Sequence, residues 1–192
     1  MRLIFIGMVL FGALTAPALA HTAVGPTDSF GAGFAHPFGG ADHLIAITLV
    51  GLWSVLAGGR AIIAWPVTFG AAMLGGFAAA SAGLQISFVE AAICLSVVLL
   101  GAFIALEVRV SVMPGISAIG ILAFFHGHAH GTEAAAAKLV PYAAGFTLAT
   151  AVLLFVGMGT GFCAGSLPGT VVVRTAGGCA ALIGLSLLGG LA

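Results

Sequence analysis

The sequence has very few charged side chains. Five basic and five acidic residues make up 5% of its 192 positions, whereas soluble domains carry about 25%. So few charges cannot cover the surface of a water-soluble domain of this length. The formal net charge is zero and no basic stripe is present, which argues against a nucleic-acid partner. Together with 61% hydrophobic residues, this scarcity predicts an all-α integral membrane protein.

Two chemical signatures are also missing. Cys94, Cys163 and Cys179 lie singly in apolar runs, without the paired spacing of a zinc or redox motif, so we expect them to be packing residues. The sequence contains no Gly-x4-Gly-Lys-Ser/Thr phosphate loop. Any transport activity is therefore expected to proceed without ATP hydrolysis.

The N-terminal segment has the features of a secretory signal peptide. Arg2 is followed by an apolar run over 3–14 and then by the small-x-small triplet Ala18-Leu19-Ala20. This pattern predicts a signal peptide over 1–20, cleaved after Ala20, and a single transmembrane domain over 21–192. The alternative is an uncleaved anchor helix, for which the apolar run is short.

The rest of the chain divides into apolar stretches separated by glycine, proline or charge. Each stretch approaches the ~20 residues that a helix needs to cross a bilayer, and helices satisfy their own backbone groups in lipid. The sequence therefore predicts a bundle of about six transmembrane helices. The predicted spans are 42–58, 61–81, 86–107, 112–130, 139–163 and 170–191.

The few basic residues predict how this bundle is oriented. With the mature N-terminus outside the cytoplasm, six spans place Arg60, Arg109 and Arg174 at cytoplasmic helix ends and Lys138 on the outer side. This distribution obeys the positive-inside rule and agrees with the signal peptide. We therefore expect a multi-pass protein of the bacterial inner membrane, with lipid as its surroundings and a periplasmic mature N-terminus.

A first group of polar residues precedes the first predicted span. It reads His36-Pro-Phe-Gly-Gly-Ala-Asp42-His43. Pro37 and the pair Gly39-Gly40 disfavour a continuous helix, so the chain is expected to enter as a broken or re-entrant segment. Such interrupted segments point to binding sites in transporters. A helix N-cap is the alternative role for Asp42.

A second group ends the fourth predicted span. His126, His130 and Glu133 are spaced i, i+4 and i+7 and so share one helix face, whereas His128 points away from His126. Two imidazoles four residues apart can hold one metal ion, and Glu133 can bind the ion or orient a ring. The alternative is a polar helix end at the membrane interface.

A carboxylate in the third predicted span completes the candidate set. Glu90 lies about one turn into this span from its outer end, where a lone buried charge needs a cation or a proton; an interfacial glutamate is the alternative. Imidazoles and carboxylates without thiolates suit Ni²⁺, Zn²⁺, Co²⁺ or Fe²⁺ better than Cu⁺. The candidate metal ligands are His36, Asp42, His43, Glu90, His126, His130 and Glu133, and the choice among His126, His128 and His130 stays open.

These motifs resemble those of the HupE/UreJ family of nickel permeases. The resemblance rests on His36-Pro-x-x-Gly-x-Asp42-His43 and Phe-His-Gly-x-Ala-His130-Gly-x-Glu133, and it extends over essentially the whole mature chain. It implies a transporter that supplies nickel to hydrogenase or urease, with these five numbered residues on the metal path. Ni²⁺ is then the transported substrate rather than a resident cofactor, with Co²⁺ or Zn²⁺ as further candidates. Nickel-enzyme maturation proteins are the implied protein partners.

Two other functions fit the same residues. One is an intramembrane metal-dependent hydrolase, in which the ion activates a water molecule; Ser87 is the nearest nucleophile by depth. The other is an accessory subunit that binds metal without transporting it. Flux of the ion across a reconstituted bilayer separates the permease from both.

Small residues form a stripe near the end of the fifth predicted span. Gly157, Gly161, Gly165 and Gly169 recur every four residues, and such stripes let membrane helices approach closely. The stripe fits internal helix packing, or a seam between two copies in a homo-oligomer. The last two glycines are expected to lie in the loop that follows.

Overall fold

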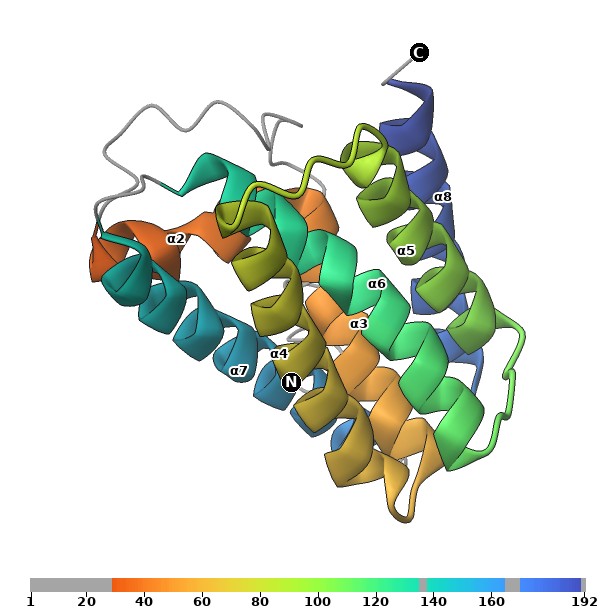
Figure 1. Cartoon of the computed structure of the whole chain (residues 1–192). Coiled ribbons are helices and arrows are strands. Elements are labelled where there is room, and N and C mark those ends of the chain that lie inside the picture. Colours follow the sequence, from red (N-terminus) through yellow and green to blue (C-terminus); the bar gives the residue numbers. More distant parts are fainter. Residues whose placement is uncertain (1–28, 135–137, 165–169, 191–192) are drawn as a thin grey trace.

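The computed structural model describes residues 29–134, 138–164 and 170–190, and they form a bundle of helices without strands (Figure 1). The predicted signal peptide and its cleavage site lie outside these residues. The seven helices are α2 (Phe30–Gly39), α3 (Ala41–Ala57), α4 (Ala61–Ser81), α5 (Val89–Ala105), α6 (Val112–Glu133), α7 (Leu139–Ala164) and α8 (Thr170–Gly189).

Helices α3 to α8 occupy the six predicted spans, and the all-helical membrane class is confirmed. Among the described residues, four helices (α4, α6, α7 and α8) are long and apolar enough to cross a bilayer, and the bent pair α2–α3 gives a fifth span if it is counted as one. Helix α5 is apolar but has only 17 residues, or roughly 26 Å at 1.5 Å per residue, against a hydrocarbon thickness of about 30 Å. A sixth crossing by α5 therefore stays a prediction.

The chain breaks sharply between α2 and α3. The two helices meet at 85° because Gly40 adopts an extended conformation with φ −110° and ψ 126°. Helix α2 begins where the Ser29 hydroxyl accepts a hydrogen bond from the Ala32 backbone N–H at 3.1 Å. The predicted broken segment is thus confirmed, and α2 lies across one end of the bundle (Figure 1).

Helices α2 and α7 pack through glycine at close range. A Cβ atom on Gly33 of α2 would collide with the backbone carbonyl of Tyr142, and one on Gly145 of α7 would collide with the carbonyl of Phe30. Only glycine allows the two backbones to approach this closely. This contact holds α2, and with it His36, against the bundle.

The glycine stripe of α7 serves internal packing over the part that the structure describes. A Cβ atom on Gly157 would collide with the Thr48 carbonyl of α3, and one on Gly161 would press on the Val55 side chain. These two glycines therefore face α3. Gly165 and Gly169 lie outside the described residues.

The basic residues are distributed unequally between the two ends of the bundle. The Arg174 side chain donates from Nε to the Ala105 carbonyl at 3.0 Å, which joins the start of α8 to the end of α5. Arg60 lies in the α3–α4 connection and Arg109 in the α5–α6 connection, at the same end. Lys138 precedes α7 at the opposite end, where α2 and α3 meet.

Helix α4 packs along α6, and this contact depends on glycine on both sides. A Cβ atom on Gly76 would collide with the Phe124 carbonyl, and one on Gly127 would collide with the Met73 carbonyl. The backbones are therefore in direct contact at the level of His126 and His128. Any side chain at either glycine has to separate the helices.

We predict that Gly76→Ala lowers the thermal unfolding midpoint of the detergent-solubilised protein, because overpacking typically costs about 1–3 kcal/mol. Gly75→Ala is the matched control, since a Cβ atom there meets nothing within 4 Å and alanine is the better helix former. Size-exclusion after a heating series measures both midpoints. Equal midpoints in the two variants would contradict close α4–α6 packing.

Candidate metal centre

Three imidazoles from three helices converge at the end of the bundle where α2 and α3 meet. His36, His43 and His130 each offer one ligand atom, and these atoms lie within 4.8 Å of one another. In comparison, nitrogens bound to one ion at angles from 90° to the tetrahedral angle lie about 3.0–3.4 Å apart at usual metal–nitrogen distances. The three rings are therefore near enough to share one transition-metal ion if they move closer together on binding.

Each ring is positioned by the end of a helix. His36 lies in the last turn of α2, His43 in the first turn of α3, and His130 in the last turn of α6. His43 and His130 are buried, at 2% and 0% exposure, and Phe146 of α7 stacks on the His130 ring at 4.6 Å between centroids. Helix α7 thus forms one wall of the centre.

Asp42 lies behind His43. Its Oδ1 accepts from His43 Nδ1 at 3.0 Å and from the His43 backbone N–H at 2.7 Å. Nδ1 therefore carries the proton, and the lone pair is on Nε2, which is buried and has no hydrogen-bond partner in the described part of the chain. This carboxylate–imidazole arrangement is common behind metal ions. The geometry makes Asp42 an orienting partner of His43 rather than one of the three converging ligands.

The alternative role proposed for Asp42 is wrong. The N-cap of α3 is Gly40, without a side-chain cap hydrogen bond, and Asp42 lies inside the first helical turn. A carboxylate at this place is favoured by the helix dipole. The dipole and His43 together explain a buried charge at this position.

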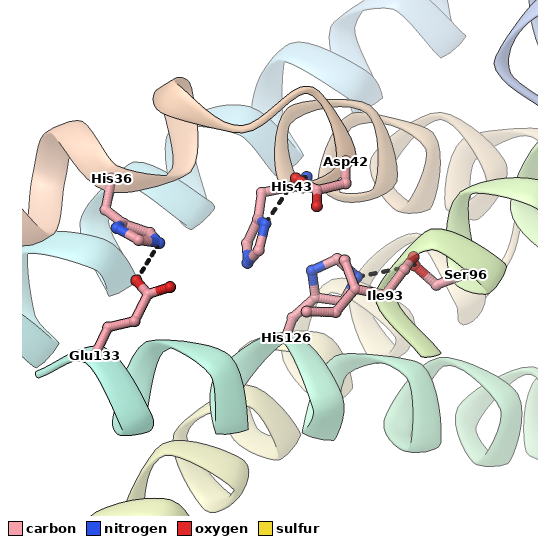
Figure 2. A network of polar contacts seen from close by, with 7 residues as sticks. All are labelled: His36, Asp42, His43, Ile93, Ser96, His126 and Glu133. Carbon is pink, nitrogen blue, oxygen red and sulfur yellow. Dashed lines mark hydrogen bonds and ion pairs between the residues drawn. The ribbon is translucent and has the colours of Figure 1, made fainter. Parts of the chain in front are cut away.

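Glu133 joins the centre from the C-terminal end of α6. Its Oε2 lies 3.2 Å from His36 Nε2, with 21% of the Glu133 side chain and 11% of the His36 side chain exposed. Figure 2 shows this pair on one side of His43, with His126 and Ser96 on the other. Glu133 is thus placed to orient His36 or to bind an ion directly.

The structure separates the two remaining histidines of α6. His126 packs beside His43, with ring centroids 4.8 Å apart. His128 is directed elsewhere: its Nε2 lies 2.8 Å from the Leu84 carbonyl, and it lines a cavity of about 740 Å³ that none of the three converging imidazoles borders. His126 therefore adjoins the centre and His128 does not.

Glu90 lies in the first turn of α5, half-buried, and is not part of the converging group. Its predicted role in metal binding stays a prediction. Cys94 is buried, Cys163 and Cys179 are exposed, and within the described ranges none of them joins the group. The three converging donors are thus imidazole nitrogens, whereas the sequence predicts a set of imidazoles and carboxylates.

Two residues near the centre escape detection from the sequence. Ser96 of α5 contacts His126 Nε2 at 2.9 Å. Tyr142 of α7, the one tyrosine of the chain, lies 6.1 Å from His36 between ring centroids, and its buried hydroxyl has no hydrogen-bond partner among the described residues. Each is an uncharged polar residue in a mostly apolar helix, and the sequence does not show which side chains of the neighbouring helices lie beside it.

Comparisons with known proteins give a family match over most of the chain. Residues 8–187 match the family described as HupE / UreJ protein. Over 180 residues the chain is 40% identical to protein HupE of Rhizobium leguminosarum bv. viciae, an overlap of 93% of this chain and 94% of the relative. No solved structure matches the chain. The family match includes every residue of the centre.

We predict that Asp42→Asn lowers the affinity of the purified protein for Ni²⁺ by about 10- to 100-fold, the usual effect of losing a partner behind a ligating imidazole. Asparagine preserves the shape but removes the charge that favours the Nδ1–H form of His43. Glu107→Gln is the control, because it removes a carboxylate near Arg174, away from the centre. Equilibrium dialysis measures the affinities, and an unchanged value in Asp42→Asn would show that Asp42 does not support His43.

Proposed function

The chain belongs to the HupE/UreJ family, and we propose that it is a secondary permease that carries Ni²⁺ into the bacterial cytoplasm for a nickel enzyme such as hydrogenase or urease. The observation that carries the proposal is the convergence of His36, His43 and His130 in a bundle of apolar helices. Polar groups are costly inside a membrane protein and mark ion pathways. Three imidazoles from different helices fit an ion that passes between those helices.

The proposed orientation of the metal centre rests on the arginines. Arg60, Arg109 and Arg174 lie at the end of the bundle opposite the three imidazoles. By the positive-inside rule this end faces the cytoplasm. The metal centre then faces the periplasm, where an incoming ion is first met.

The donor set supports a borderline metal ion as the substrate. Imidazole nitrogens suit Ni²⁺, and also Co²⁺ and Zn²⁺, whereas a thiolate set would favour Cu⁺. Three nitrogens leave part of the coordination shell to water or to Glu133. Incomplete protein coordination is useful here, because an ion that is held too firmly cannot be released.

The membrane potential is a sufficient driving force. Two positive charges moving inward through 100 mV release about 4.6 kcal/mol, which corresponds to roughly a thousandfold concentration ratio. Uptake therefore does not require ATP or a coupled ion. This agrees with the missing phosphate loop in the sequence.

The nucleophile named for the hydrolase alternative does not lie at the three imidazoles. Ser87, its nearest nucleophile by depth, lines the cavity beside His128 and not the group of three imidazoles. The accessory-subunit alternative shares the metal centre with the permease. Flux of Ni²⁺ across a reconstituted bilayer distinguishes the two.

We predict that His130→Ala reduces Ni²⁺ flux into proteoliposomes at least about tenfold, because it removes one of three converging ligands. His128→Gln is the control: it removes an imidazole two residues away, while its amide still donates to the Leu84 carbonyl. Both variants are compared at equal reconstituted amounts. The permease proposal fails if the parent protein binds Ni²⁺ without passing it, and the metal centre fails if His130→Ala transports normally.

A further inference from the structure

The Ser96 hydroxyl bridges two helices. Its Oγ lies 2.6 Å from the Ile93 carbonyl oxygen of its own helix and 2.9 Å from His126 Nε2 of α6. A carbonyl can only accept, and a serine hydroxyl has a single hydrogen to donate. At 2.6 Å that hydrogen must lie between the two oxygens. Ser96 therefore accepts from His126, and His126 Nε2 carries a proton.

This contact fixes the tautomer of His126. With the proton on Nε2, the neutral ring has its lone pair on Nδ1. That nitrogen is fully buried and has no hydrogen-bond partner in the described part of the chain. Figure 2 shows this edge of the ring turned toward His43. A buried acceptor without a partner is unfavourable unless something occupies it.

His43 also has a nitrogen with an available lone pair. Asp42 holds its Nδ1 proton, so its lone pair is on Nε2, which is also buried and without a partner among the described residues. The His43 and His126 rings are 4.8 Å apart between centroids and nearly perpendicular, at 84°. The two lone pairs, each fixed by a hydrogen bond on the opposite side of its ring, thus belong to imidazoles that pack against each other.

We propose that His43 and His126 form a second, deeper position for the transported ion, and that Ser96 is the positioning residue that makes His126 a ligand. His126 lies four residues before His130, which is roughly 6 Å further into the bundle along α6. His43 belongs to both positions, and its single available lone pair cannot bind two ions. The ion is therefore handed from the outer position to the inner one.

This inference rests on the proposed function and predicts which kinetic constant Ser96 controls. Beyond His126 the core is apolar: the Phe69 ring lies 5.8 Å from His126, and Phe69, Ile119 and Ala123 are fully buried. The outer imidazoles capture the ion and set the KM. The inner position governs the step into the apolar core, and hence the maximal rate.

The tautomer is tested directly by long-range ¹H–¹⁵N NMR of detergent-solubilised protein with ¹⁵N-labelled histidine and no metal. We expect His126 in the Nε2–H form, lost in Ser96→Ala and retained in Ser96→Thr, which keeps the hydroxyl. Ser54→Ala is the matched control, because Ser54 is equally buried and donates to the Gly51 carbonyl at 2.7 Å within its own helix. An Nδ1–H form of His126 in the parent protein would overturn the assignment.

Transport then tests the inner position. Ser96→Ala should lower the maximal rate of Ni²⁺ uptake into proteoliposomes about tenfold, with the KM and the equilibrium affinity for Ni²⁺ within about twofold of the parent. Ser96→Thr should restore the rate, and Ser54→Ala should match the parent. If the parent transports Ni²⁺ and Ser96→Ala transports it equally fast, the inner position is wrong and the permease stands. If the parent passes no Ni²⁺, the proposed function itself fails, whatever the tautomer of His126.

Discussion

The metal centre depends on the break in the chain at Gly40. His36 and His43 are seven residues apart, and in one continuous helix they would lie on the same face about 10.5 Å from each other. The 85° turn between α2 and α3 instead brings their ring centroids to 5.9 Å and places both against α6. The extended backbone at residue 40 makes the turn, and close packing of Gly33 on α7 keeps α2 in place. The turn between α2 and α3 thus brings two of the three imidazoles of the candidate centre together.

A second feature is that one ring of the centre and one ring beside it are each held by a hydrogen bond. Asp42 holds one nitrogen of His43 and Ser96 holds one nitrogen of His126. In each ring the other nitrogen has the lone pair. In an apolar bundle these hydrogen bonds are strong, and they reduce the reorganisation that binding requires. In the proposed function, Asp42 and Ser96 therefore orient the two imidazoles without themselves binding the ion.

The sequence predicts the helices better than it predicts the contacts between them. Apolar length and glycine or proline breaks locate six helices, and the i, i+4 spacing of His126 and His130 correctly places these two rings toward one side of α6. The same information does not show that Asp42 lies behind His43. Nor does it identify Ser96, because a serine in a membrane helix usually bonds its own backbone, and whether it also meets an imidazole depends on how α5 packs on α6. The same holds for Glu90, because the sequence predicts its depth in the span but not which residues of other helices lie beside it.

The most direct test of the centre is X-ray absorption at the nickel edge on the purified, nickel-loaded protein. Binding by His36, His43 and His130 predicts imidazole scattering with nitrogen and oxygen neighbours and no sulfur. It also predicts that imidazole scattering is lost when all three are changed to alanine. A sulfur shell around the nickel, or an unchanged imidazole signal in the triple variant, would show that the ion binds elsewhere.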